Sequence, residues 1–343
     1  MSRAQLTSTV EQNSAGAAPF SVAGKNKIIN GDFGIWQRGT SFSYSTSAPD
    51  QYYADRFKFN WYGPGSSSNL VISQQAFTAG SAPVAGYEAP YFLRLALPVS
   101  SSGTYYELYQ RIEDVRTLAG QTVTFSFWAR NSGSQGFSIE VQQNFGSGGS
   151  STVYQYATAG AFSSGWARYS YTFTLGSLSG LTIGTGSFLQ FKIYSGSATA
   201  SAFNLDLWGW QVERGSVATP FTTASGTLQG ELALCQRYLP AFNSSGSTSA
   251  VAVGTFVGST DLRMPFVFPV TPRVAPTGVS VSSASHFSAY NGTSFAISVI
   301  ALSISSNYAA TLSITTTGGT GGQSAPVTCG NSAGQILFTG CEL

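Results

Sequence analysis

Apolar and polar residues alternate over several short runs of the chain. Val123, Phe125 and Phe127 alternate with threonine and serine, and the same pattern recurs over 169–175 and 189–194. Successive side chains of a β-strand point to opposite faces, so each run predicts a strand with one apolar face. Clusters of glycine, proline and serine, which favour turns, separate the runs at 63–65, 133–136, 146–151 and 195–197. We therefore predict that residues 25–225 form a β-sandwich.

The β pattern is interrupted once. Leu232, Cys235, Tyr238 and Leu239 recur at the spacing of one helix face, and Pro240 would end the helix. We predict one short helix within a linker spanning 226–249. It would join the sandwich to a second domain.

Residues 250–343 predict a second, small β domain. Its only charged residues are Asp261, Arg263, Arg273 and Glu342. The proline-rich stretch 265–276 suits an edge strand or a connection, because proline cannot donate to a central ladder. The uncharged apolar run 295–302 would promote aggregation at an open sheet edge. Burial between subunits would remove that hazard, which favours an oligomer.

Composition narrows the class of protein. The 343 residues suffice for two domains. Charged residues make up 9%, against about a quarter in an ordinary domain. The 14% of aromatic residues excludes the usual signature of disorder. The net charge of +2 without a basic cluster argues against nucleic acid. No apolar run is long enough to predict membrane insertion, and the polar residues 1–20 predict no secretory leader.

Residues 1–24 lack apolar periodicity. Two interpretations stand: a disordered terminus, or an arm that orders when it docks on a neighbouring subunit. Cys235, Cys329 and Cys341 lack metal-ligand spacing. Cys329 and Cys341 could pair if their strands are neighbours. Free thiols are favoured, since we expect assembly in a reducing cytoplasm.

Two segments far apart in the sequence carry a family resemblance. The first is KIINGDFGIWQRGT at 27–40, and the second is NLDLWGWQVERGSVATPF at 204–221. They resemble the opening and closing strands of a carbohydrate-binding-module sandwich, in a version similar to modules of bacteriophage tail-fibre and other virion proteins. ELALCQRY at 231–238 and MPFVFPVTPRVAPTGVSV at 264–281 are also similar to phage appendage segments.

The resemblance implies an all-β protein: a jelly-roll β-sandwich, a short linker helix and a second small β-sandwich domain. It implies a bacteriophage virion structural protein, a tail fibre or tail appendage component. Such a protein would form a closed homotrimer, contact other virion proteins through its arm, and bind host surface polysaccharide. The first alternative is a capsid decoration (cement) protein that stabilises the shell. The second is a polysaccharide depolymerase.

Sugar binding would use aromatic faces with a few polar groups. Loop-like segments supply candidates for glycan binding or, equally, for subunit contacts. They are Tyr52, Tyr53, Trp61, Tyr62, Tyr105, Tyr106 and Tyr109. The tryptophans of predicted strands are assigned to the core. Among these, Trp208 and Trp210 would share one face by the period of two.

We expect no enzyme. The single histidine, His286, has only Asp261 and Glu342 as acids in its domain, and no nucleophile motif accompanies them. Glycosidases need two carboxylates across a cleft. The candidate pairs are Glu107 with Glu113 and Asp206 with Glu213.

No cofactor is expected apart from a structural calcium ion. The family resemblance places Asp32 and Asp206 where related sandwiches hold calcium through carboxylate and backbone oxygens. Gly34, however, stands where the motif often has a carboxylate or amide. The alternative is that Asp32 caps a turn and Asp206 pairs with an arginine.

Overall fold

The computed structural model describes residues 23–45, 48–62, 70–85, 87–97, 101–200, 202–246 and 248–343. Of residues 48–49, 62, 101–104 and 197–200 it describes the backbone alone. All but the last two residues of the predicted N-terminal arm lie outside this part of the chain. Within it, no helix is long and apolar enough to cross a membrane.

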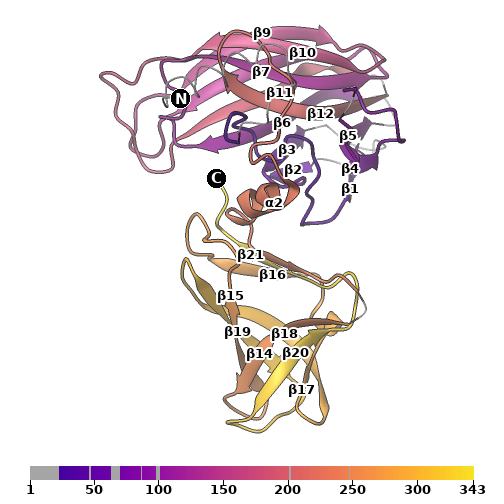
Figure 1. The fold of residues 1–343 in the computed structure, drawn as a ribbon, viewed down its shortest axis with the longest axis vertical. Coiled ribbons are helices and arrows are strands. Elements are labelled where there is room, and N and C mark those ends of the chain that lie inside the picture. The colour runs from indigo at the N-terminus through magenta and orange to yellow at the C-terminus, as the bar shows by residue number, and fades with distance from the viewer. Residues whose placement is uncertain are drawn as a thin grey trace, which may run out of the picture. The chain divides into compact units, whose positions relative to one another are not determined.

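The chain divides into two compact units (Figure 1). The sandwich unit contains the described residues up to Gly34, together with Ser41–Gln51 and Lys58–Glu231. The barrel unit contains Ile35–Thr40, Tyr52–Phe57 and Leu232–Leu343. The predicted boundaries at 25–225 and 250–343 treated each domain as one continuous stretch. Two short segments of the N-terminal region instead belong with the C-terminal residues.

Two antiparallel sheets of six strands form the sandwich unit. The first sheet has the order β1 (Ser41–Tyr44), β4 (Leu70–Ala76), β5 (Tyr91–Leu97), β12 (Phe203–Arg214), β7 (Thr122–Asn131) and β10 (Ala167–Thr174). The second sheet has the order β2 (Ala48–Tyr52), β3 (Phe57–Tyr62), β6 (Ser101–Glu113), β11 (Phe188–Ala200), β8 (Gly136–Asn144) and β9 (Val153–Ala161).

The core of the sandwich unit lies between these sheets. The predicted inward residues Val123, Phe125 and Phe127 of β7 are fully buried, and so is Phe191 of β11. The rings of Phe125 and Phe191 lie 5.4 Å apart between centroids, so they join one sheet to the other. The predicted all-β fold with a jelly-roll sandwich is confirmed.

Trp208 and Trp210 do not share a face as predicted. Trp208 packs in a cluster with Trp128 and Phe221, whereas Trp210 contacts Phe125 in the core between the sheets. The β12–β7 register shifts between Trp208 and Gln211. Gly209 has a φ of +68°, and a Cβ there would lie 2.7 Å from the Trp128 ring. This bulge interrupts the period of two, which local sequence cannot reveal.

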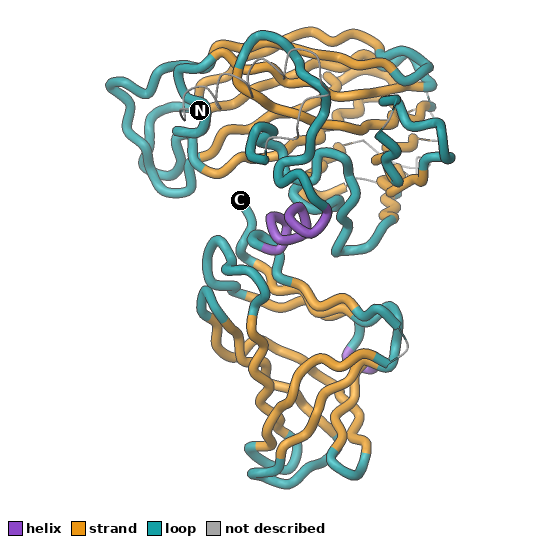
Figure 2. Tube along the Cα trace, viewed as in Figure 1, coloured by secondary structure: helices purple, strands orange, loops and turns teal. Residues whose placement is uncertain are grey.

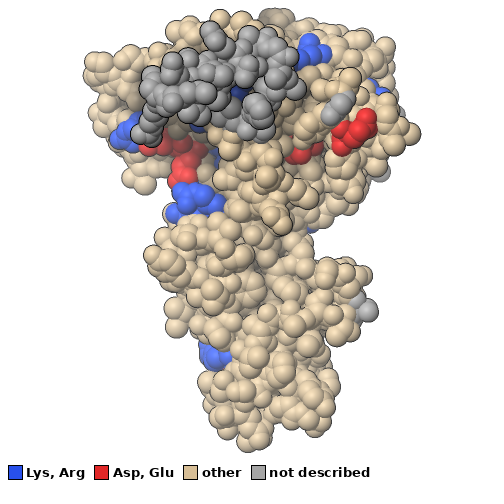
Figure 3. All heavy atoms as spheres, in the orientation of Figure 1, with Lys and Arg blue, Asp and Glu red and all other residues tan. Residues whose placement is uncertain are grey.

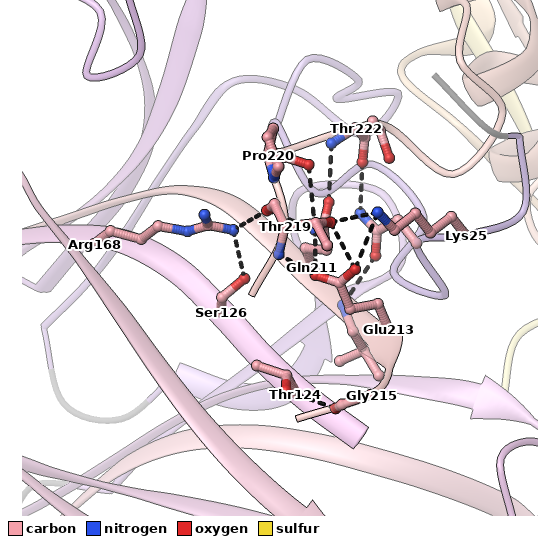
Figure 4. Close-up of polar contacts among 12 residues, drawn as sticks. Lys25, Thr124, Ser126, Arg168, Gln211, Glu213, Gly215, Thr219, Pro220 and Thr222 are labelled. Carbon is pink, nitrogen blue, oxygen red and sulfur yellow. Dashed lines mark hydrogen bonds and ion pairs between the residues drawn. The ribbon is translucent and has the colours of Figure 1, made fainter. Parts of the chain in front are cut away.

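A polar network ties the residues just before the first motif to the second motif (Figure 4). Glu213 accepts hydrogen bonds from the backbone N–H and the hydroxyl of Thr219 at 2.9 and 2.7 Å. The Gln211 amide donates to it at 2.7 Å, and the Lys25 ammonium lies 3.3 Å away. Asn26 donates to the Trp210 carbonyl and accepts from the Val212 N–H. The network therefore fixes the opening segment and the closing loop on β12.

We expect Glu213→Gln to lower the free energy of unfolding by about 2 kcal/mol, because charge-assisted hydrogen bonds are lost. Burial opposes ionisation of Glu213, but the bonds from Thr219 and Gln211 and the charge of Lys25 outweigh it and hold its pKa below the usual 4.5. The contribution is therefore present above pH 4.5 and lost as pH falls through the lower pKa of the folded state.

Urea unfolding across this pH range tests the role of Glu213. The difference between wild type and Glu213→Gln should shrink in acid. The matched control is Glu88→Gln at an exposed position. A difference that is equal at all pH values, or an equal loss in the control, would contradict the assignment.

The barrel unit combines a helix, a small sheet and a closed barrel (Figure 2). Helix α2 (Leu228–Gln236) spans the division between the units and confirms the predicted helix, with an earlier end. The small sheet has the order β13 (Ala241–Asn243), β21 (Gln335–Thr339) and β16 (Gly278–Val281). The barrel has the order β14 (Ser249–Phe256), β15 (Asp261–Val267), β19 (Ala309–Thr316), β18 (Ser294–Ser305), β17 (Phe287–Tyr290) and β20 (Ser324–Cys329), with the short 3₁₀ helix η1 (Ala284–His286) before β17.

This barrel stands where a second small β-sandwich was predicted. Closure comes from β14, which pairs with both β15 and β20. The apolar run 295–302 lies in β18: Phe295 and Ala296 pair with β17, and the residues from Ile297 onwards pair with β19. Pro265 pairs only with β19, beyond the reach of the short β14–β15 ladder. All three cysteines are free and buried, as favoured above.

Buried charges anchor the two N-terminal segments of the barrel unit. The Arg38 guanidinium lies 2.5 Å from Glu342 and 3.6 Å from Asp55, and the Gln37 amide donates to Asp55 at 2.6 Å. Burial raises the pKa of Asp55 to about 6, although Arg38 and Gln37 lower it. Burial likewise raises the pKa of Glu342, against the effect of Arg38.

We expect Arg38→Met to lower the free energy of unfolding by about 3–5 kcal/mol at neutral pH, because Asp55 and Glu342 lose one of the two cations that act on them, Arg38 and Arg56. The loss should be smaller in mild acid, below the pKa of about 6 of Asp55, where this carboxyl is protonated. Chemical denaturation at the two pH values measures it. The control, Arg116→Met, removes an exposed pair with Asp114 and should change stability by less than about 1 kcal/mol. Equal losses in both variants would contradict this role.

Candidate functional site

A cleft of about 480 Å³ opens on the outward face of the second sheet. Leu189, Phe191 and Ile193 of β11 point into the core, so Gln190 and Lys192 point outward. In β6, β8 and β9 every second side chain likewise points outward, and some of these line the cleft. The cleft is lined by Asp50, Glu107, Tyr109, Arg111, Glu140, Gln142, Tyr154, Tyr156, Gln190 and Lys192.

Strand register places these side chains in two rows across four strands. The first row follows the pairs Tyr109–Lys192, Lys192–Glu140 and Glu140–Tyr156. The second row contains Arg111, Gln190, Gln142 and Tyr154 in the same order of strands. Polar and charged groups therefore occupy the floor, and two tyrosines stand at the β9 edge.

Lys192 is the electrostatic centre of the cleft. Its ammonium lies 2.9 Å from Glu140 and 3.1 Å from Glu107. Burial lowers the pKa of Lys192, but the two glutamates outweigh it and hold the pKa above its usual value, so the residue is a cation. Glu107 also accepts a hydrogen bond from the Tyr105 hydroxyl at 2.7 Å. These contacts fix the floor before any ligand arrives.

The remaining floor residues are also held in place. The Tyr109 hydroxyl donates to Asp50 at 2.5 Å, and the Lys58 ammonium neutralises Asp50 at 2.9 Å. Burial and the bond to Asp50 raise the pKa of Tyr109. Arg111 donates to the Gln190 side chain at 3.1 Å. Each charge lining the cleft thus has a defined neighbour.

Tyr154 and Tyr156 form the exposed wall of the cleft. Their exposed fractions are 48% and 59%, high for aromatic residues of a strand. The two rings are nearly parallel, at 4°, with centroids 6.2 Å apart. The Gln142 amide donates to the Tyr154 hydroxyl at 3.3 Å. Parallel aromatic faces beside hydrogen-bonding groups suit the C–H faces and hydroxyls of sugars.

Two tyrosines of the predicted set lie at this cleft. Tyr109 lines it but is only 3% exposed, and the Tyr105 hydroxyl donates to Glu107, which also lines it. Tyr53, Trp61 and Tyr106 are buried, with exposed fractions of 1–2%, so they cannot offer rings to a glycan. The segments judged loop-like are largely strands whose aromatic residues point inward.

Two predicted tyrosines remain, Tyr52 and Tyr62. The Tyr52 hydroxyl donates to the Leu343 carbonyl within the barrel unit, and the side chain of Tyr62 is outside the described residues. Sequence analysis missed Tyr154, Tyr156 and Glu140, and placed Lys192 only in a strand. The available signal was the alternation of polar residues at 138–142 and 190–194. It predicts outward-facing polar side chains, but only the pairing of the strands shows that they lie side by side.

The two carboxylates of the predicted calcium site are not brought together. Asp206 is bound by Arg94 at 2.6 and 2.8 Å and by Arg130 at 2.7 Å, which matches the alternative of pairing with arginine. Asp32 follows Gly31, whose carbonyl accepts the Trp210 N–H. Asp32 therefore lies next to Trp210, which is four positions along β12 from Asp206, or about 13 Å at the rise of a strand. Calcium ligands lie within about 2.6 Å of the ion, so the two carboxylates are too far apart to share one.

Asp32 lies beside Glu231 instead. Burial and the charge of Glu231 raise the pKa of Asp32 to about 6, against a hydrogen bond from the Gly34 N–H. Within the described residues, no group of three or more histidine, cysteine, aspartate or glutamate side chains is arranged for a metal.

The candidate catalytic groups are engaged in other contacts. His286 Nδ1 lies 3.0 Å from the Ser282 hydroxyl, and no carboxylate contacts the ring in the described structure. Asp261 pairs with Arg263 at 2.7 Å, and Glu342 with Arg38. Glu213 belongs to the Figure 4 network and Asp206 to the arginine pair. None of these acids faces another across the cleft.

Residues 89–195 match the family model described as a carbohydrate binding domain (CBM 4/9). The match runs from β5 into β11 and includes every cleft residue except Asp50. This part of the chain is similar to CBM4/9 domains and has a jelly-roll-like β fold. No curated protein matches the sequence of the chain.

Solved structures with related folds include a phage protein and two sugar-binding modules. The enzymatically active domain of bacteriophage CBA120 tailspike protein 4 is 11% identical, with a TM-score of 0.34 and coverage of 56% of this chain and 22% of the tailspike. This chain thus spans under a quarter of that protein. The xylan-binding CBM22-1 domain of Paenibacillus barcinonensis Xyn10C is 13% identical (TM-score 0.32; 58% and 100% covered). TmCBM61, solved with β-1,4-galactotriose, is 12% identical (TM-score 0.29; 55% and 99% covered).

Proposed function

We propose that this protein is a non-enzymatic glycan-binding protein whose ligand lies in the cleft of the second sheet. The observation that carries the proposal is the pair of parallel, exposed tyrosines above a floor of fixed polar groups. This arrangement falls within the segment that matches a carbohydrate binding domain.

The cleft residues divide the work of binding. Tyr154 and Tyr156 stack against successive sugar rings, while Gln142 and Gln190 exchange hydrogen bonds with hydroxyls. Glu140 and Lys192 orient those hydroxyls through charge-assisted bonds. Because the floor is already held by internal contacts, little side-chain entropy is lost on binding. An open cleft across four strands suits a polysaccharide chain better than a small closed ligand.

We expect Tyr156→Ala and Tyr154→Ala each to weaken glycan binding about tenfold or more, the equivalent of about 1.4 kcal/mol, since each removes a stacking face. A glycan array identifies the ligand, and calorimetry measures the change. The control is Tyr290→Ala, which removes a ring of similar exposure (53%) from the barrel unit. Unchanged affinity in both cleft variants would sink the proposal.

We further expect the protein to release no reducing ends from a polysaccharide that it binds. Glycosidases separate the roles of two carboxylates, one as acid and one as base or nucleophile. Here Glu107 and Glu140 share one partner, the ammonium of Lys192. A reducing-sugar assay on wild type and Glu107→Gln tests this. Release that is lost in the variant would instead establish a depolymerase.

We also propose that the binding cleft serves a bacteriophage virion, as a tail fibre or tail appendage component that contacts host surface polysaccharide. Support comes from the motifs at 27–40 and 204–221, which resemble virion modules. The capsid decoration role is the alternative, and labelling of intact particles distinguishes the two.

Self-association, with a homotrimer as the expected form, is part of this proposal. The support lies in the exposed side chains of the barrel unit. Val267, Ile304 and Tyr308 are 75%, 68% and 74% exposed. Figure 3 shows how sparse charged atoms are on the face in view. Apolar side chains with little charge around them favour contact between identical copies.

A further inference from the structure

A second pocket, of about 310 Å³, lies in the sandwich unit apart from the cleft residues. Its size suits one small ring rather than a polymer. Tyr87, Pro90, Tyr91 and Leu228 supply apolar walls, and Leu228 is 73% exposed at the start of α2. The Tyr87 ring is fixed by Trp208 and Phe221, with centroids 5.4 and 5.7 Å away.

The two carboxylates of this pocket differ in the hydrogen bonds that they accept. Glu231 is buried, and its two oxygens accept the backbone N–H groups of Asn30 at 2.7 Å and Ser225 at 2.6 Å. Among the described residues, Asp32 by contrast receives only a long bond of 3.4 Å from the Gly34 N–H, besides a contact with its own backbone. Asp32 therefore has spare acceptor capacity at the pocket.

No lysine or arginine is among the residues lining this pocket. Other buried acids of the sandwich unit have a cation beside them: Glu213 has Lys25, Asp206 has Arg94 and Arg130, and Glu140 has Lys192. Buried carboxylates are costly unless their charge is compensated. In the part of the chain that the structure describes, the pocket thus combines carboxylates that have no cation beside them with aromatic walls, a combination that the cleft lacks.

We propose that this pocket binds the ammonium group of an amino sugar. The ammonium donates to Asp32. The rings of Tyr87 and Tyr91 cover the apolar face of the sugar ring and attract the ammonium by cation–π interaction. The choice of a sugar as carrier rests on the proposed glycan-binding function, whereas the choice of an ammonium rests on the pocket alone. Calcium fits less well, because it takes six to eight oxygens, whereas the pocket lining offers two carboxylates and each Glu231 oxygen already accepts one N–H group.

The test compares two monosaccharides that differ only at the amine. Glucosamine and N-acetylglucosamine are titrated by NMR into the whole chain, at a pH where the free amine is protonated. Wild type should bind glucosamine at least tenfold more tightly. Asp32→Asn should abolish this preference, and Tyr91→Ala, which changes a partly exposed ring, should weaken glucosamine binding. Tyr156→Ala, in the cleft, should leave the preference unchanged.

Three results would overturn the inference: equal binding of the two sugars, a preference that survives in Asp32→Asn, or a calcium-dependent rise in Tm that Asp32→Asn removes. The last would assign the pocket to calcium. Loss of polysaccharide binding in Tyr156→Ala with glucosamine binding intact would uphold both sites. Glucosamine binding without any polysaccharide binding would reject the cleft function alone.

Discussion

The contact between the two sheets of the sandwich unit determines where the rest of its chemistry can lie. Phe125 and Phe191 meet between the sheets, and Trp210 packs against Phe125. Because Phe191 must point inward, its neighbours Gln190 and Lys192 must point outward. The polar floor of the cleft is thus the reverse side of the hydrophobic core. Any change of register in β11 would exchange the two faces.

Most charged residues in the described part of the chain are partly or fully buried. Lys25, Arg94, Arg130 and Lys192 each compensate an acid that the fold has buried. The low charge content therefore reflects a hydroxyl-rich surface together with an interior that uses ion pairs at defined positions. Against this background the uncompensated pair of Asp32 and Glu231 stands out. Neighbouring acids without a cation are tolerated where a ligand or a proton can neutralise them.

Sequence reasoning reached the strands and the fold class because alternation is a local property. It placed Val123, Phe125 and Phe127 correctly and found the helix that begins at Leu228. It could not find the closed barrel, because a strand in a barrel and a strand in a sandwich alternate alike. Closure depends on the pairing of β14 with β20, between residues far apart in sequence. The bulge at Gly209 was hidden for the same reason.

The candidate site was less predictable than the fold. Each strand contributes only two or three residues, which look like ordinary outward positions when read alone. Tyr156 becomes part of a binding surface only because β9 pairs it with Glu140, which β11 in turn pairs with Lys192. Aromatic residues near turns, such as Tyr53 and Tyr106, satisfied the local criteria but were needed in the core. Strand register, which local composition does not encode, decides between a core ring and a binding ring.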